Sequence, residues 1–169
     1  MSKIASIISS LKFYIFCFLN LRDVKFKFIG KKIVNTGWSE AVCYFKVELP
    51  IQNIYAYIKT DNNNNITMQI SETPHYQYIS STSGKEIYFK YKKEKFGLEK
   101  KYVENKFDNL ISSISENGLN SEILISKDMI LPTQKCAYIL DGVHRSSVLL
   151  SQNKSNVECY IAHKNQILN

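Results

Sequence analysis

The chain has 169 residues, 44% of them hydrophobic, which is enough for one domain with a buried core. Its formal net charge of +7 favours an anionic partner, and it does not choose among nucleic acid, nucleotide and membrane surface. The cysteines show no CxxC or His-Cys spacing, which argues against a zinc site of the usual local kind. We expect buried thiols, kept reduced in a cytoplasm, at Cys17, Cys43, Cys136 and Cys159.

Residues 1–22 have the pattern of an amphipathic helix, with apolar side chains at helical spacing at Ile4, Ile8, Leu11, Ile15 and Phe18. The longest uncharged apolar run, 13–19, is far shorter than the roughly 20 residues that span a bilayer. Lys12 interrupts any signal-peptide core. We therefore expect no transmembrane segment. The helix is predicted to pack on the domain or on a protein partner, with peripheral membrane contact as the alternative.

The next part of the chain has the composition of β-strands. Pro50 interrupts the second of these strand-like segments, and the asparagine-rich tract 60–65 predicts a turn or a short loop. Trp38 is expected to be a packing residue rather than a platform for a sugar. The predicted strand segments are 24–34, 43–59 and 66–70, the last of which breaks at 72–74.

Residues 83–106 hold eight lysines and four glutamates, with Tyr88, Phe89, Tyr91 and Phe96 interleaved. Aromatic rings that stack on bases, beside lysines that contact phosphates, are typical of a nucleic-acid surface. The alternative is a solvated helical insertion whose aromatic side chains pack inward. Both interpretations stay open from the sequence.

The remaining elements complete a mixed α+β pattern. Phe107, Leu110, Ile111 and Ile114 lie at helical spacing, and Gly118 predicts the end of that helix. We then expect strands at 122–126, 136–140 and 157–162, a connection with a short extended piece at 127–135, and a helix at 143–153.

The sequence DGVHR, residues 141–145, stands where the strand 136–140 meets that helix. Gly142 permits a sharp turn and close approach of a ligand to the main chain. Free amides of a helix N-terminus, from Val143 to Ser146, form a natural anion site. His144 and Arg145 add side-chain donors, and arginine can bind a phosphate through two parallel hydrogen bonds.

Asp141 is unusual next to a phosphate site, since a carboxylate repels phosphate unless a metal ion or a transferred proton lies between them. It therefore indicates Mg²⁺ coordination or acid-base chemistry. A purely structural interpretation stands beside this one. Asp141 then caps the helix, His144 is a partly buried donor, and Arg145 pairs with a nearby carboxylate.

The order of helix "SISENGL", strand "EILIS", strand "AYILDG", helix "VHRSSVLLSQN" and strand "VECYIA" resembles the ParB/sulfiredoxin superfamily over residues 103–162. The segments "FKVELPIQNI" and "ISETPHY" resemble the first part of that fold less clearly. The resemblance implies a nucleotide-binding domain over 46–169, with a Lys/Tyr-rich insertion at 80–102 and an N-terminal helix and strand extension at 1–45. It also implies a nucleotide-phosphate site at Gly142, Val143, His144, Arg145 and Ser146.

Three branches of the superfamily differ at this turn. Sulfiredoxins have a catalytic cysteine where this chain has Val143, which cannot perform thiolate chemistry. Chromosome-partitioning ParB proteins have a Glu-Arg-Arg turn followed by a helix-turn-helix region, and the sequence after residue 145 is too short to hold one. Free-serine kinases have an Asp-Gly-His-x-Arg turn. Asp141 and Arg145 match that turn directly, and His144 is displaced by one position.

The kinase branch implies ATP, or another nucleoside triphosphate, with Mg²⁺ at Asp141. It implies a catalytic role for Asp141 and Glu72, with Glu72 as the base, and His75 and Tyr76 are candidates to bind the acceptor. The segment "TPHYQYI" also resembles ParB-like proteins of bacterial surface-polysaccharide gene clusters. We expect a cytoplasmic kinase for a small hydroxyl compound, with serine as one candidate. The alternatives are a ParB-like nucleic-acid-binding or nuclease protein and a nucleotide-sensing module that docks through residues 1–22.

Overall fold

The computed structural model describes residues 25–35, 39–59, 64–126 and 137–167, together with the single positions Ile8 and Ile15, which are helical and exposed. The predictions for the rest of the N-terminal helix, for Trp38, and for the connection 127–135 therefore lie outside the described residues. Within those ranges the chain combines a seven-stranded mixed sheet with four α-helices, which confirms the predicted α+β class.

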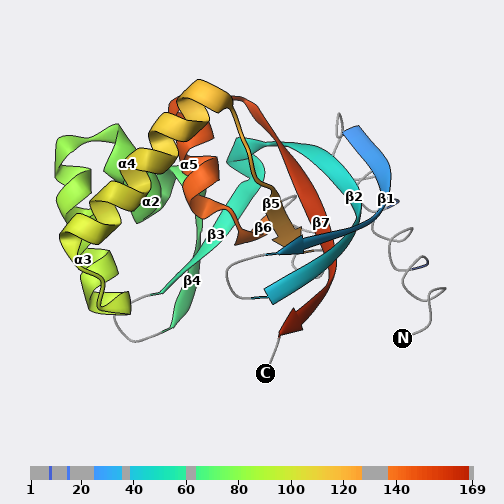
Figure 1. Ribbon diagram of the computed structural model, residues 1–169, viewed down its shortest axis with the longest axis horizontal. Helices are drawn as coiled ribbons and strands as arrows, with labels where there is room; N and C mark the ends of the chain where they lie inside the picture. Colours follow the sequence, from blue (N-terminus) through green and yellow to red (C-terminus); the bar gives the residue numbers. More distant parts are fainter. Residues whose placement is uncertain are drawn as a thin grey trace.

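The sheet joins strands that are distant in the sequence. Its strands are β1 (Lys25–Asn35), β2 (Ser39–Pro50), β3 (Ile54–Lys59), β4 (Asn65–Gln69), β5 (Ile123–Ser126), β6 (Ala137–Asp141) and β7 (Asn156–Ile167). Their spatial order is β1-β2-β7-β5-β6-β3-β4, with parallel pairing between β5 and β7 and between β3 and β6. The long strands β1, β2 and β7 form one side of the molecule, and the helices gather on the other (Figure 1).

The helices are α2 (Pro74–Ser80), α3 (Thr82–Phe96), α4 (Lys100–Asn117) and α5 (Val143–Ser151), with short 3-10 helices η1 (Ile51–Asn53) and η2 (Ile70–Glu72). Thr73 caps α2 by accepting a hydrogen bond from the Tyr76 amide, and Ser81 caps α3 by accepting one from the Gly84 amide. Gly97 ends α3 in the left-handed conformation. Of the helices that the structure describes, none is long and apolar enough to span a lipid bilayer.

The core has two clusters because β5 is buried on both faces. Ile123 and Ile125 belong to a large cluster that the helices cover. Leu124, between them, belongs to a smaller cluster with β1, β2 and β7. Successive side chains of a strand point to opposite faces, so the two clusters lie on opposite sides of β5.

The lysine-rich segment is helical, and two of its four interleaved aromatic side chains are buried. This segment forms α3 and the first half of α4. Tyr88 and Phe89 are buried in the large cluster, whereas Phe96 is 43% exposed. Tyr88 and Phe89 therefore contribute to the core rather than to a binding surface.

The predicted order from α4 to β7 is confirmed, and the helix expected to end at Gly118 does so. The residues on either side of the predicted domain boundary, 45 and 46, both lie within β2. Because β2 pairs with β7 along its whole length, the first strands of the chain share one sheet with the last.

Candidate functional site

The sequence DGVHR forms a tight joint between β6 and α5. Gly142 has φ +111°, a conformation that residues with a β-carbon rarely adopt. A β-carbon there would lie 3.0 Å from Cγ1 and 3.2 Å from Cα of Ile123. The joint therefore requires glycine, both for the conformation and for the close approach of β5.

The first turn of α5 leaves main-chain donors available. The Ser146 amide donates to the Gly142 carbonyl at 2.9 Å, so it is already used in the helix. The amides of 143–145 precede it and have no intrahelical acceptor. Ser146 is completely buried, and its Oγ has no hydrogen-bond partner among the described residues. Val143 packs against the large core cluster.

Arg145 is held from two sides at this joint. Its Nη2 donates to the main-chain carbonyl of Glu122 at 2.8 Å and lies 3.2 Å from Oδ2 of Asp141. Its Nε is buried and has no hydrogen-bond partner in the described part of the chain. An unpaired buried donor costs free energy, so Nε is a donor whose hydrogen bond the described residues leave unmade.

Asp141 does not cap α5, since Gly142 occupies the N-cap position and no side chain caps this helix end. The Asp141 carboxylate pairs with Arg145 through Oδ2. The structural interpretation of this turn predicted that Arg145 pairs with a nearby carboxylate, and Asp141 is that carboxylate. The Asp141 side chain is still 36% exposed. Its second oxygen, Oδ1, makes no hydrogen bond or ion pair within the described ranges.

His144 lies among the helices. Its Nε2 is 2.6 Å from the hydroxyl oxygen of Tyr88, and its ring centroid is 4.9 Å from that of Phe107. Burial, with smaller contributions from nearby lysine and arginine charges, lowers the pKa of His144 to about 3. His144 is therefore neutral at physiological pH, so it brings no positive charge to a phosphate.

His75 meets His144 in the same interior. The two ring centroids are 4.5 Å apart, and His75 is 5% exposed. Its Nδ1 is buried without a partner in the described residues, and burial lowers the pKa of His75 well below the ordinary range. Two of the predicted site residues are thus brought together, but in the packed helix layer.

Glu72 and Tyr76 lie at the start of α2. The Glu72 Oε2 accepts a hydrogen bond from the Gln69 amide at 3.1 Å, in a capping box of η2. Tyr76 is partly exposed. Both η2 and α2 pack against α5. However, no hydrogen bond or ion pair joins Glu72 to Asp141 in the described part of the chain.

Sequence analysis missed Glu122, which contacts this joint, and Lys32, which contacts Glu122. Glu122 precedes β5 and accepts the hydrogen bond from Arg145, and its carboxylate pairs with Lys32 of β1 at 2.5 Å. The sequence contained one signal for Lys32. Two consecutive lysines after Gly30 break the alternation of the strand, which indicates an irregularity.

Lys92 is a third residue that sequence analysis did not single out. Its Nζ lies 4.9 Å from the ring centroid of Phe96 and 5.3 Å from that of Tyr88. Burial, followed by the charge of Lys106, lowers the pKa of Lys92 to about 8. Within the described part of the chain, its amine contacts aromatic rings and forms no ion pair with a carboxylate.

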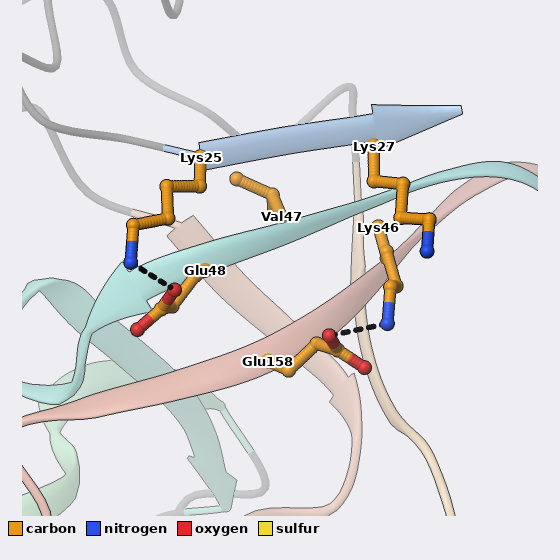
Figure 2. Close-up of a pocket in the computed structure, with 6 residues that line it drawn as sticks. All are labelled: Lys25, Lys27, Lys46, Val47, Glu48 and Glu158. Carbon is orange, nitrogen blue, oxygen red and sulfur yellow. Dashed lines mark ion pairs between the residues drawn. The ribbon is translucent and has the colours of Figure 1, made fainter. Parts of the chain in front are cut away.

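A shallow hollow of about 200 Å³ lies on β1, β2 and β7 (Figure 2). Lys25 pairs with Glu48 at 3.3 Å and Lys46 with Glu158 at 2.5 Å across it. Lys27 also lines the hollow, and it makes no ion pair with another residue of the described ranges. Because these charges largely compensate each other, the hollow offers an anion less than the joint before α5 does.

Comparison of the chain with protein-family models, with curated proteins and with solved structures gives no match. Within the described ranges, no three His, Cys, Asp or Glu side chains form a group that could hold a metal ion.

Proposed function

We propose that the protein is an ATP-dependent phosphotransferase that acts on a small hydroxyl compound and binds the nucleotide phosphates at the N-terminus of α5. The observation that carries the proposal is the state of Arg145. Two of its contacts fix the guanidinium beside the open first turn of α5, while its buried Nε lacks an acceptor. A phosphate oxygen supplies the missing acceptor.

The order of α4, β5, β6, α5 and β7 supports a ParB/sulfiredoxin-like fold as part of this proposal. It is the order on which the resemblance to that superfamily rests. The corresponding turn in that superfamily binds nucleotides. If the chain has this fold, the expected ligand of the joint is ATP or another nucleoside triphosphate.

The joint has the properties that a phosphate group requires. Gly142 has no side chain to block the approach to the main chain, and the amides of 143–145 carry the positive end of the helix dipole. Magnesium fits less completely, since Asp141 Oδ1 is the one carboxylate oxygen at the joint without a protein partner in the described residues. Mg²⁺ commonly takes one or two carboxylates together with phosphate oxygens and water, and when bound it neutralises phosphate charge.

Glu72 is the proposed base for the acceptor hydroxyl. Its Oε2 is used in the capping box, which fixes the side chain, and its Oε1 makes no hydrogen bond among the described residues. Tyr76, partly exposed on the next turn, is the proposed contact for the acceptor. His75 is buried, so we propose that it packs beneath Glu72 and Tyr76 and does not contact the acceptor. Serine is a candidate acceptor, a cytoplasmic location is proposed, and a role in surface-polysaccharide synthesis is consistent with the resemblance.

The test is transfer of phosphate from ATP with Mg²⁺ to a panel of small alcohols that includes serine, followed by mass spectrometry. We expect Asp141→Asn and Glu72→Gln each to lower the rate by about 100-fold or more, as for loss of an acid-base group. Glu116→Gln, an exposed acid of α4, is the matched control and should leave the rate unchanged. Circular dichroism checks that each variant is folded.

Two results would overturn the proposal. One is the absence of both ATP binding and product with every acceptor. The other is tight DNA or RNA binding that weakens steeply with salt and occurs without nucleotide turnover, which would favour the nucleic-acid alternative.

A further inference from the structure

Residues 122 and 123 touch both ends of the joint before α5. The Glu122 carbonyl accepts the hydrogen bond from Arg145 at 2.8 Å. The next residue, Ile123, packs so closely on Gly142 that a β-carbon there would be 3.2 Å from its Cα. The position of this short segment therefore determines where the Arg145 guanidinium lies.

Glu122 lies just before β5, outside the hydrogen-bond ladder of the sheet, so its own contacts hold it in place. Its carboxylate pairs with the Lys32 ammonium at 2.5 Å. The same ammonium lies 3.5 Å from the Tyr160 hydroxyl and 4.5 Å from the centre of the Tyr160 ring. The ion pair thus connects the segment before β5 to both β1 and β7.

The pair remains ionised over the working pH range. The hydrogen bond between the two side chains raises the pKa of Lys32 and lowers the pKa of Glu122. Because both shifts favour the charged forms, the contact is a permanent one rather than a pH switch.

Lys32 directly follows an irregularity in β1. The register of β1 against β2 shifts between Phe28 and Lys32, around Gly30 with φ +72°. Such irregularities change the direction of the side chains that follow them. The lysine that pairs with Glu122 thus comes directly after this irregularity in the strand.

We propose that the Lys32–Glu122 ion pair is a positioning device that holds Arg145 in place for the nucleotide phosphates. The nucleotide in this inference comes from the proposed function. The effect of the ion pair on the position of Arg145 does not depend on that function. Lys32 and Glu122 are positioning residues, since they act through the Glu122 main chain and not on the substrate.

The chain offers a direct readout because it contains two arginines, Arg22 and Arg145. In protein labelled with ¹⁵N-arginine, the Nε–H signal that disappears in Arg145→Lys identifies Arg145. We expect Lys32→Met and Glu122→Gln to shift or broaden this signal. The Lys32→Glu/Glu122→Lys double variant should restore it, because it rebuilds the pair with opposite charges.

The matched control is the Lys46–Glu158 pair, which has the same 2.5 Å separation and links β2 to β7 at the hollow in Figure 2. Lys46→Met should leave the Arg145 signal unchanged. With ATP as the probe, we expect Lys32→Met and Glu122→Gln to raise the dissociation constant about tenfold, the loss of about 1.4 kcal/mol. In turnover they should raise KM more than they lower kcat.

The outcomes separate the two proposals. An Arg145 signal that is unchanged in folded Glu122→Gln overturns the positioning role. A signal that moves in Lys32→Met and Glu122→Gln and returns in the double variant, in a protein that binds no ATP, supports positioning and rejects the proposed function. If one single variant fails to fold, the other is read alone beside Lys32→Arg, which keeps the ion pair. Lys32→Arg should then preserve the Arg145 signal and the ATP affinity, and a change in both would contradict the inference.

Discussion

The hydroxyl of Tyr88 and the imidazole of His144 depend on each other inside the helix layer. Tyr88→Phe keeps the packed ring and removes the partner of His144 Nε2. We expect the free energy of unfolding to fall by about 1–3 kcal/mol, the cost of leaving a buried polar atom unpaired. Urea denaturation measures this loss.

Tyr102→Phe is the control for that experiment, since the Tyr102 side chain is 55% exposed. It should change the stability by less than about 0.5 kcal/mol. Equal losses in the two variants would show that the hydrogen bond to His144 contributes nothing.

The neutral state of His144 predicts acid sensitivity. Its pKa is about 3 in the folded protein, against an ordinary value of 6.5. Between these two values the unfolded chain binds more protons at this position than the folded one, so the free energy of unfolding falls as the pH falls from 6.5 towards 3. His75, whose pKa is also lowered, acts in the same direction.

Urea denaturation at pH 7.5 and pH 4.5 tests this sign. We expect His144→Gln to lose less stability than the wild type between the two pH values, because the carboxylates titrate in both proteins and the imidazole in only one. The same loss in both would mean that His144 does not contribute.

At the scale of residues, sequence analysis could predict the joint but not the directions of its side chains. The turn at Asp141 and Gly142 was predictable because a strand pattern ends there and a helix pattern begins. The inward direction of His144 depends on Tyr88 of α3, which lies 56 residues earlier in the sequence. No local pattern contains that information.

The junction between α2 and α3 leaves no space for a side chain at Gly84. A β-carbon there would lie 1.8 Å from the Gln77 carbonyl oxygen, which is main chain and cannot rotate away. We expect Gly84→Ala to lower the free energy of unfolding by about 3 kcal/mol, since the two helices must separate. Thermal or urea denaturation measures it.

Gly97→Ala is the matched control for Gly84→Ala. Gly97 has a positive φ of 63° but no atom within 4 Å of the added carbon. Its replacement should cost about 1 kcal/mol, for the conformation alone. A larger loss at Gly97 than at Gly84 would contradict the packing argument.

The elements were predictable where one local signal was enough. Pro50 ends β2, Pro74 begins α2, and Gly118 ends α4, each through its own backbone chemistry. The contact of Lys32 with Glu122 was not predictable, because it depends on a register shift in β1 and on a segment ninety residues further along the chain.

The whole molecule is expected to unfold as one unit, although residues 1–45 were predicted as an extension. Cys43 lies in the smaller core cluster and Cys159 in the large one, and both have 0% exposure. Burial raises the pKa of Cys43 to about 12 and also raises that of Cys159, so neither thiol is reactive in the folded state.

Alkylation across a urea series, with each cysteine read by mass spectrometry, tests this cooperativity. We expect both thiols to be protected in buffer and to become reactive at the same urea concentration, which is also the midpoint by circular dichroism. Labelling of Cys43 at a lower concentration than Cys159 would show that β1 and β2 unfold separately.

The central place of β7 has a consequence for the synthesis of the protein. The sheet seats β7 between β2 and β5, and Ser39 of β2 is paired with Ile167. The ribosome therefore synthesises β2 long before β7, and until β7 is made the edge of β2 that pairs with β7 is unpaired. Contacts this distant in sequence form slowly, and unpaired edges invite association with other chains. During translation, we therefore expect the hairpin of β1 and β2 to be open to such association until β7 has been made.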